Sequence, residues 1–535
     1  MENENTFERV DIDFEAIANS LQGSNQVVIY GVNPMAMITM LELSLINIPT
    51  VFFADEAPDR QGYFGRPVLK MTDIPPAISL NPLVIIAKKL DDEEPIRDAF
   101  RQRGYFKFFS LKTLQYVNRQ RQRRIEMQWL SQIARMINVS SDKPVDAGMK
   151  MQMLLQMNHN KELRKAVFVS LNLSARSYKI MKAVQKQGIK VDYIHVLGGA
   201  ADPSVRESVI AEADSYSETG SHIDLLIRLM TSQASFVHLF SHAWSPELMC
   251  IMSYLIYKKK FLPTVVFDQY DVGRLYTNFP QLTYANEQFC MENADIVTDR
   301  SFEVDYLIEH HDCKLQRPKV QLFDGCDERI QAPYFIIKDD APLRLCYAGG
   351  LVNVKVQDDW DWTGLAKYCE EKRCHIDVYP APGNWRDPNY KQRFEEFFIW
   401  DREIEFFNLH NPVPYDNLVK TLNQYDYGTH PMKRVGEHST ADQLGYYTKW
   451  KRVYASSNHF FDYISAGLPI IANRSERICK YFASLGIGIN FAVEDYDFEF
   501  LKANRQKYRE RVKEVRPQLY TNNLVKPLLE LILPI

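Results

Sequence analysis

Two stretches in the last third of the chain decide the fold. The first is Leu343-Arg-Leu-Cys-Tyr-Ala-Gly-Gly-Leu351, and the second is Ser457-Asn-His-Phe-Phe-Asp-Tyr-Ile-Ser-Ala-Gly-Leu-Pro-Ile-Ile-Ala-Asn473. The first predicts a buried strand that runs into a Gly-Gly turn, where a backbone without Cβ atoms can lie close to a diphosphate. The second predicts a helix that Gly467 ends and a strand that begins after Pro469. Together they predict a Rossmann-like unit.

The same alternation of strands and helices continues toward the N-terminus. Apolar runs at 166–171, 234–240 and 264–267 predict further strands, separated by helical patterns. Such alternation is typical of α/β domains around parallel sheets. A polar stretch with two prolines precedes the final unit, so we expect one domain at 163–335 and another at 336–535.

A third α/β unit is expected at 1–115. Residues 26–30 predict a strand, Gly31 a turn, and the following residues an apolar helix and a second strand. This order outlines half of a dinucleotide-binding domain, but Asn33 and Met35 stand where a pyrophosphate-binding turn needs small residues. We therefore expect a Rossmann-like accessory module that binds no dinucleotide, with a genuine NAD site as the alternative.

Residues 116–162 are expected to form a helical connector. Its segment 118–124 carries four arginines. A cationic helix face is most often exposed to water, and contact with anionic lipid or with a partner protein is the alternative.

Composition limits the classes of protein that the chain can belong to. Of its 535 residues, 46% are hydrophobic and 25% charged, which is typical of a globular chain rather than a disordered one. The 64 basic and 68 acidic residues give a net charge of −4 and no reason to expect nucleic-acid binding. No apolar run approaches the roughly 20 residues of a membrane span. Eight cysteines without a C-x-x-C pair favour buried free thiols in a reducing compartment. We expect a cytoplasmic protein, with peripheral contact at the inner membrane face as the alternative.

In their order along 165–500, these segments resemble the GT-B nucleotide-sugar glycosyltransferases. The likeness is greatest to the large group of often retaining bacterial enzymes known as glycosyltransferase group 1 or family 4. In that group an acid and an aromatic residue precede a Gly-x-Pro, and the acid accepts hydrogen bonds from the donor ribose. Here the acid is Asp462, followed by Tyr463, and Gly467 with Pro469 completes the pattern. The resemblance implies two facing Rossmann-like domains, preceded here by the module and the connector.

The resemblance also implies a reaction and a set of site residues. A sugar would pass from a UDP- or GDP-linked donor to a hydroxyl of a glycan, lipid-linked glycan or protein, in bacterial surface polysaccharide or glycoconjugate synthesis. No metal or other cofactor is expected. The donor-binding residues implied are Gly349, Gly350, Lys355, Lys451, Asn458, His459, Asp462 and Tyr463. On the acceptor side, His242, Asp268 and Asp271 would orient or deprotonate the acceptor hydroxyl.

Three positions depart from the pattern of that family. Tyr454 stands eight residues before Asp462, where many members carry a first acid. His459 replaces a lysine that meets phosphate in one subgroup, and Tyr270 with Asp271 stands where a catalytic histidine is frequent. These departures favour, as an alternative, a GT-B protein without catalysis that binds glycan or supports a partner transferase. A nucleotide-sugar epimerase with the same two-domain cleft is the other alternative.

Overall fold

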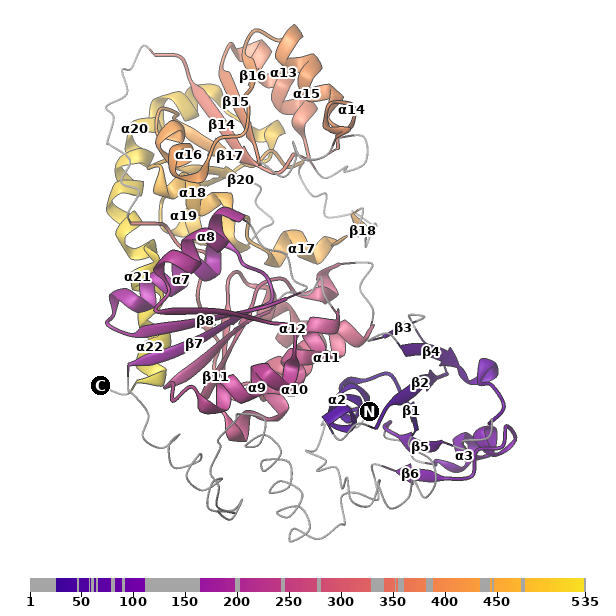
Figure 1. Cartoon of the computed structure of the whole chain (residues 1–535). Coiled ribbons are helices and arrows are strands. Elements are labelled where there is room, and N and C mark those ends of the chain that lie inside the picture. Colours follow the sequence, from indigo (N-terminus) through magenta and orange to yellow (C-terminus); the bar gives the residue numbers. More distant parts are fainter. Residues whose placement is uncertain are drawn as a thin grey trace.

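The structure is a computed structural model of the 535-residue chain (Figure 1). The residues it describes are 26–45, 48–56, 58, 62–63, 66–77, 82–88, 92–110, 164–197, 203–241, 246–276, 281–328, 341–351, 353–354, 360–381, 388–433, 443–444, 447–472 and 477–533. The expected connector at 116–162 lies outside these residues, and so do His242 and Lys355.

The N-terminal module is built on a sheet of six strands in the order β3-β4-β2-β1-β5-β6. Every pair of neighbours is parallel except β3 and β4. Its elements are β1 (Val27–Tyr30), α2 (Pro34–Leu45), β2 (Thr50–Asp55), β3 (Gly62–Tyr63), β4 (Arg66–Lys70), η1 (Met71–Asp73), β5 (Leu83–Ile86), α3 (Glu94–Arg101) and β6 (Phe108–Ser110). Strands β1 and β5 are buried along their whole length, because helices and neighbouring layers cover both faces of the sheet.

The middle domain has a seven-stranded parallel sheet in the order β13-β12-β11-β10-β7-β8-β9. Its elements are β7 (Lys165–Ser170), α7 (Ala175–Lys186), β8 (Lys190–Val196), α8 (Pro203–Glu212), β9 (Ser215–Thr219), α9 (His222–Thr231), β10 (Phe236–Phe240), α10 (Pro246–Tyr257), η2 (Lys259–Phe261), β11 (Thr264–Gln269), η3 (Gly273–Leu275), α11 (Gln281–Asn293), β12 (Ile296–Asp299), α12 (Glu303–His311) and β13 (Val320–Gln321). The direction of the strand order reverses between β7 and β10, which makes this a doubly wound, Rossmann-like sheet.

The C-terminal domain has a six-stranded parallel sheet in the order β16-β15-β14-β17-β20-β21. Its elements are β14 (Arg344–Gly349), α13 (Trp362–Lys372), β15 (His375–Pro380), α14 (Tyr390–Arg393), α15 (Glu395–Glu403), β16 (Phe407–Leu409), α16 (Tyr415–Leu422), β17 (Tyr427–Thr429), β18 (Gln443–Leu444), β19 (Tyr447–Thr448), α17 (Lys449–Tyr454), α18 (His459–Ser465), β20 (Ile470–Ala472), α19 (Arg477–Ser484), β21 (Gly488–Asn490), η5 (Val493–Asp495), α20 (Phe498–Val515), η6 (Arg516–Leu519), α21 (Thr521–Leu524) and α22 (Lys526–Ile532). Gly467 follows α18 with φ +80° and β20 begins just beyond Pro469, as the sequence predicts. The direction of the strand order reverses between β14 and β17.

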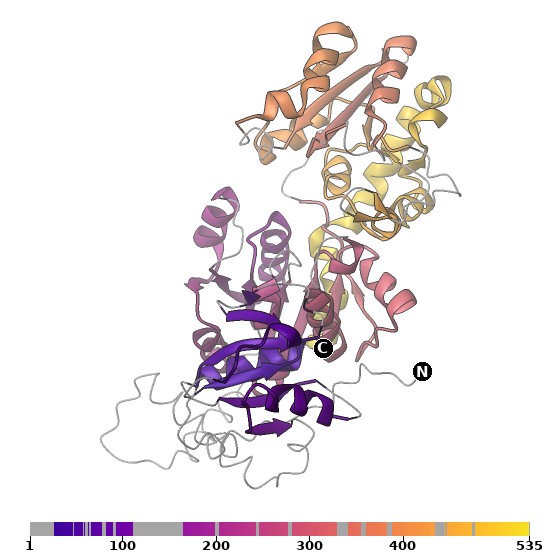
Figure 2. The same cartoon turned by 90° about the vertical axis from the view of Figure 1, so that its right-hand side faces the viewer.

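Helix α2 attaches the module to the middle domain. It is apolar almost all round, because it packs between the sheet of its own module and the helices α10 and α11. One continuous core contains Met37 and Ile38 from α2 together with Met252 and Leu255 from α10. Two views place the module beside the middle domain and away from the C-terminal domain (Figure 1, Figure 2).

Two segments of the C-terminal part of the chain pack on the middle domain. Helix α17 adds Tyr454 to the core that contains α10, with Trp450 and Val453 packed against it. Helix α22 adds Leu528 and Leu529 to the core on the opposite face of the middle sheet. The middle and C-terminal domains are therefore joined by buried apolar contacts at two places as well as by the connecting chain.

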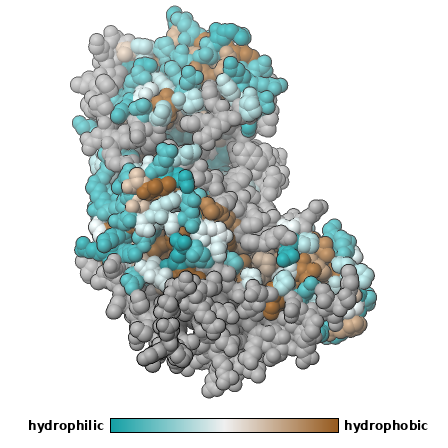
Figure 3. All heavy atoms as spheres, viewed as in Figure 1, coloured by the Kyte–Doolittle hydropathy of each residue, from teal (hydrophilic) through white to brown (hydrophobic). Residues whose placement is uncertain are grey.

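The described surface is mainly polar, and the cysteines are buried. Hydrophilic side chains cover most of the described surface in the view of Figure 3, and the apolar patches there are small and scattered. All eight cysteines are free and buried, as the sequence predicts. Within the described ranges, no helix is long and apolar enough to cross a membrane.

Candidate active site between the middle and C-terminal domains

The carboxyl ends of the middle and C-terminal sheets meet at one junction. Ligands of open α/β sheets bind outside the carboxyl ends of the strands, where the strand order reverses. In the C-terminal domain this point is occupied by the Gly349-Gly350 turn after β14 and by His430 after β17. Opposite it lie Tyr270, which follows β11, and Arg300, which follows β12. The side chains of Arg300 and Tyr270 both contact Asn458, just before α18.

The Gly349-Gly350 turn has the shape that close approach of a ligand requires. A Cβ atom on Gly349 would lie 2.7 Å from Nδ1 of His459 and 2.9 Å from the hydroxyl of Tyr347. Only glycine therefore allows the His459 ring to reach the end of β14. A Cβ atom on Gly350 would have no described atom within 4 Å, so the backbone of Gly350 borders open space. The Tyr347 hydroxyl donates to the Gly350 carbonyl at 2.7 Å and fixes the turn.

His459 is a neutral ring in an aromatic cluster. Its centroid lies 5.3 Å from that of Tyr347, 5.4 Å from that of His430 and 5.8 Å from that of Phe460. Burial, and then the neighbouring His430, lower the pKa of His459 well below its usual value. The Ser457 hydroxyl is 2.5 Å from its Nε2. His459 therefore offers a ring nitrogen and an aromatic edge at the turn, but no positive charge near neutral pH.

Tyr463 positions the site but does not face the cleft. Its side chain is fully buried, and its hydroxyl accepts from the backbone N–H of Ala348 at 2.9 Å and donates to the carbonyl of Thr429 at 3.2 Å. These bonds hold α18 against the ends of β14 and β17. Direct contact of Tyr463 with a donor, which the sequence pattern implied, stays a prediction, because in this structure the ring is fully buried and the hydroxyl proton is donated within the protein.

We expect Gly428→Ala to destabilise the C-terminal domain by about 1–3 kcal/mol, because overpacking a fixed core costs this much. A Cβ atom on Gly428 would lie 2.2 Å from the Tyr463 ring, which its two hydrogen bonds hold in place. Denaturant unfolding of the full chain measures the change. Gly350→Ala is the matched control and should change stability by less than about 0.5 kcal/mol. Equal stability of the two variants would contradict the fixed position of Tyr463.

Asp462 lies next to Tyr463 and is half-buried. The preceding carbonyl, that of Phe461, accepts from the thiol of Cys326 at 3.6 Å. Cys326 belongs to the Gly325-Cys-Asp327 turn of the middle domain, in which Gly325 has φ +67°. The helix turn that carries Asp462 thus lies against the middle domain, at the edge of the junction.

Asp268 is a structural carboxylate and not an acid of the cleft. It is fully buried, its two oxygens lie 3.1 and 2.8 Å from Nε and Nη2 of Arg176, and it accepts from the Thr298 hydroxyl at 2.7 Å. Burial alone would raise the pKa of Asp268, but the charge of Arg176 and the hydrogen bonds of its neighbours hold that pKa far below its usual value. Because both oxygens of this enclosed carboxylate are bonded within the protein, Asp268 has no contact with the cleft in this structure, and its expected role toward an acceptor hydroxyl stays a prediction.

Asp271 shares a cation with Glu303. Lys451, which the sequence pattern assigned to the donor diphosphate, lies 2.7 Å from Oδ1 of Asp271 and 2.8 Å from Oε1 of Glu303. Glu303 also accepts from the backbone N–H of Val272 at 2.6 Å. Because Lys451 belongs to α17 and the two acids belong to the middle domain, this triad ties the domains together. In this arrangement the charge of Lys451 is balanced within the protein.

Tyr454 occupies the place of the missing first acid and takes part in a second tie between the domains. Its hydroxyl donates to Oε2 of Glu309 at 2.6 Å, and the guanidinium of Arg477 lies 4.2 Å from its ring centroid. Arg477 in turn donates to both oxygens of Glu309 at 2.9 and 2.8 Å. The carboxylate nearest to Tyr454 is therefore that of Glu309, which belongs to α12 of the middle domain and is paired with Arg477.

Sequence reasoning missed Arg300 and Arg176. Arg300 is 5% exposed and donates from Nη1 to Oδ1 of Asn458 at 2.7 Å and from Nη2 to the carbonyl of Ser456 at 3.1 Å. The sequence feature that could have indicated Arg300 is its place directly after a buried strand, in Asp299-Arg300-Ser301. Nothing in the local sequence indicated that its partner would be Asn458.

Comparisons with known proteins find only distant likenesses. No protein-family model matches the sequence, and no curated protein is significantly similar to it. Among solved structures, a glycosyltransferase from Rickettsia africae is 10% identical with a TM-score of 0.47, over 69% of this chain and 98% of that one. The O-GlcNAc transferase of Thermobaculum terrenum is 12% identical with a TM-score of 0.43, over 78% and 75%. The UDP-GlcNAc 2-epimerase of Methanocaldococcus jannaschii is 10% identical with a TM-score of 0.40, over 69% and 99%.

Likenesses of this size indicate no activity. The architecture is decided by the chain itself, in which two doubly wound parallel sheets face each other with their carboxyl ends. The chain has the GT-B fold. The expected α/β class, with a further Rossmann-like module before the GT-B pair, is confirmed by the three sheets.

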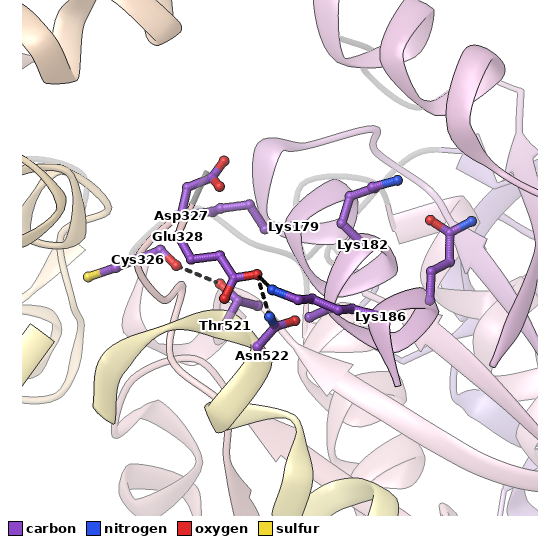
Figure 4. A pocket seen from close by; sticks show the side chains of 10 residues that line it. Lys179, Lys182, Lys186, Cys326, Asp327, Glu328, Thr521 and Asn522 are labelled. Atoms are coloured by element: carbon purple, nitrogen blue, oxygen red, sulfur yellow. Dashed lines mark hydrogen bonds and ion pairs between the residues drawn. The ribbon is translucent and has the colours of Figure 1, made fainter. Parts of the chain in front are cut away.

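A pocket of about 420 Å³ opens beside the GT-B junction, between α7 and α21 (Figure 4). Lys179, Lys182 and Lys186 lie on one face of α7, since their spacing of three and four residues returns to the same side of a helix. Asp327 and Glu328 supply the opposite charge, and Lys186 is paired with Glu328. Cys326 lines the pocket and also contacts α18. The pocket therefore carries side chains of both charges, and one of its lining residues, Cys326, also contacts α18.

The turn of the N-terminal module is filled by its own side chains. Oδ1 of Asn33 accepts from the N–H of Ala36 at 2.9 Å, and its Nδ2 donates to the carbonyl of Ala87 at 2.9 Å. Asp55 accepts from the N–H of Val32 at 2.9 Å. The backbone N–H groups of Val32 and Ala36 are thus already bonded to side chains of the module, and the absence of a dinucleotide site there stays a prediction.

Proposed function

We propose that the chain is a glycosyltransferase that holds a nucleotide-sugar donor against the C-terminal domain and an acceptor hydroxyl against the middle domain. The observation that carries the proposal is the Gly349-Gly350 turn. It lies where the strand order reverses, its second glycine borders open space, and the middle domain faces it across the junction. A turn of this kind fits the diphosphate of a UDP- or GDP-linked sugar.

In this proposal Asp462 binds the donor ribose, because a carboxylate can accept from both hydroxyls of a vicinal diol. Gly349 and Gly350 border the diphosphate, which protein cations rather than a metal neutralise. Asn458 and His459 line the same edge. Lys355 remains a predicted donor residue, and it lies outside the described residues.

We expect Asp462→Asn to weaken nucleoside diphosphate binding about 10-fold or more, since a hydrogen bond to a charged group contributes about 1.5–3 kcal/mol. The amide keeps the size of the side chain but removes its charge and one acceptor. Calorimetric titration of the full chain measures the change. The matched control is a 2′,3′-dideoxynucleoside diphosphate, which should bind wild type and variant alike. A variant that binds the ribonucleotide as tightly as wild type would remove Asp462 from the ribose site.

On the acceptor side, we propose that Asp271, while paired with Lys451, orients the acceptor hydroxyl and that the pocket beside α7 receives the rest of the acceptor. Asp271 follows β11 at the carboxyl end of the middle sheet. The pocket carries both charges, which suits a hydroxylated, charged acceptor such as a glycan or glycoconjugate in bacterial surface polysaccharide synthesis. His242 remains a predicted acceptor-side residue. Contact of residues 118–124 with a membrane or a partner protein also remains a prediction, and both lie outside the described residues.

Turnover of donors by the purified chain tests the proposal. A panel of UDP-, GDP- and CDP-linked sugars is incubated with and without glycan and lipid-linked acceptors, and free nucleoside diphosphate is measured. We expect one donor to be consumed faster with an acceptor present, and Asp462→Ala to abolish the difference. Conversion of the donor to an isomeric nucleotide sugar without acceptor would instead identify an epimerase. A panel without binding or turnover would overturn the proposal.

A second candidate function is donor or glycan binding without transfer. It is favoured because the acids expected to take part in transfer are engaged or absent. Asp268 is paired with Arg176, Asp271 is paired with Lys451, and Tyr454 replaces the first acid. This candidate predicts binding of a nucleoside diphosphate with no acceptor-dependent release. The same panel therefore separates the two functions.

A further inference from the structure

Arg300 is the cation that the middle domain presents at the GT-B junction. Its guanidinium is stacked on Tyr270, with 4.1 Å between its carbon and the ring centroid. Both of its hydrogen bonds to the C-terminal domain end on neutral oxygens, the Asn458 side chain and the Ser456 carbonyl. The nearest carboxylates are farther away, with Asp271 at 3.6 Å and Asp324 at 3.8 Å.

A continuous series of contacts runs from Arg300 to the Gly-Gly turn. Arg300 bonds Asn458, the next residue is His459, and the His459 ring lies where a Cβ atom of Gly349 would be. Asn458 is exposed, so an anion that enters at the turn can replace its side chain on the guanidinium by a rotation of one amide. A phosphate oxygen is a stronger acceptor for arginine than a neutral amide oxygen, because both partners are charged.

Three other described groups near this edge, Lys451, Arg176 and His459, offer no uncompensated positive charge to a phosphate. Lys451 is 2.7 and 2.8 Å from two carboxylates, Arg176 is bound to Asp268, and His459 is packed among aromatic rings. Arg300 also has an Nε that is buried and makes no hydrogen bond. Of Arg300, Lys451 and Arg176, Arg300 is therefore the cation whose hydrogen bonds to its interdomain partners end on neutral oxygens, which a phosphate can replace.

We propose that Arg300 provides the positive charge that holds the donor diphosphate, so that the donor is bound by both domains at once. The inference rests on the proposed function, because it concerns the same donor site. It assigns the neutralisation of the diphosphate to the middle domain, whereas the turn that receives it belongs to the C-terminal domain. A consequence is that the diphosphate itself connects the two domains, and that a nucleoside without phosphates does not.

Calorimetric titration with a nucleoside, its monophosphate and its diphosphate tests the inference in the full chain. Uridine and guanosine series are both used. We expect Arg300→Gln to weaken diphosphate binding at least 10-fold and nucleoside binding less than 3-fold, and Arg300→Lys to give an intermediate loss, since it keeps the charge but not the planar fork. Equal diphosphate affinity of wild type and Arg300→Gln would overturn the inference.

Two further variants distinguish the loss of the Arg300 charge from a general loosening of the interface between the two domains. Arg477→Gln breaks an arginine–carboxylate pair between the same domains, away from the turn, and should leave the preference for the diphosphate unchanged. His459→Lys in the Arg300→Gln background restores a cation beside Gly349 and should recover part of that preference. If Arg300→Gln weakens nucleoside and diphosphate binding alike, as a loosened interface would, the inference fails while the proposed function stands. If wild type binds no nucleoside diphosphate, the proposed function fails first.

Discussion

Arg176→Met should lower the free energy of unfolding by about 3–5 kcal/mol, the cost of leaving a buried charge without its partner. Arg176 is 3% exposed and makes a two-pronged contact with Asp268, which has no exposed surface. Its remaining amino group donates to Asp324 at 3.3 Å. Methionine has a similar volume to arginine, so the lost stability reflects the unpaired charge of Asp268 more than a new cavity.

The effect of Arg176→Met should depend on pH in a definite direction. In the wild type the pKa of Asp268 is depressed, so the pair stabilises the fold above the unfolded pKa of about 3.9 and loses this contribution as pH falls. In the variant, burial is no longer opposed by Arg176, the pKa of Asp268 rises, and protonation relieves the cost. The difference between the two proteins should therefore be greatest near neutral pH and shrink toward pH 4.

Urea unfolding of both proteins between pH 4.5 and 7.5 measures this difference. The matched control is Arg228→Met, since Arg228 forms an ion pair with Asp224 of the same length, 2.8 Å, but both side chains are about 40% exposed. That variant should lose less than about 1 kcal/mol at every pH. A loss for Arg176→Met that is small, or that does not change with pH, would show that Asp268 is not held as an enclosed ion.

Lys451→Met should also cost about 3–5 kcal/mol, because it removes the cation between two buried carboxylates and leaves only the longer contact of Asp271 with Arg300, at 3.6 Å. Lys451 bridges Asp271 and Glu303 and lies 4.5 Å from the ring centroid of Tyr276. Burial raises the pKa of Glu303, the charge of Lys451 opposes that rise, and Asp271 adds to it. Without the lysine the pKa of Glu303 should rise further, so the variant should be destabilised more at pH 8 than at pH 5.

Unfolding curves at pH 5 and pH 8 measure the effect of Lys451→Met, and Glu303→Gln in the same background should restore much of the loss at pH 8. Lys314→Met is the control, because the Lys314–Asp312 pair is more than 60% exposed on both sides. If the double variant is no more stable than Lys451→Met alone, the triad is not the source of the effect.

Much of the fold could be predicted from local sequence. The strand and Gly-Gly turn at 343–351 and the helix stop at Gly467 are short-range signals, and the structure places both as expected. The apolar helix at 34–45 was also predictable, but its packing on α10 was not, because an apolar face does not specify its partner. The GT-B pair follows from the alternation of elements, which the chain repeats twice.

The chemistry of the site was less predictable, because it depends on burial and on distant partners. A motif indicated that Tyr463 and Asp268 are important, but it could not show that both are enclosed and serve the fold. Arg300 and Asn458 are 158 residues apart, and no local pattern relates them. Lys451 looked like a free cation because its two acids also come from the other domain.

Hydrogen–deuterium exchange of the full chain, with and without a saturating nucleoside diphosphate, tests most directly whether the junction of the two GT-B domains is the donor site. If the junction binds the donor, exchange should slow in peptides that contain Gly349-Gly350 and 457–463 of one domain and in the peptide that contains Arg300 of the other. Exchange in the module around Gly31 should not change. Protection confined to the module, or no protection at the Gly-Gly turn by any nucleoside diphosphate, would contradict it.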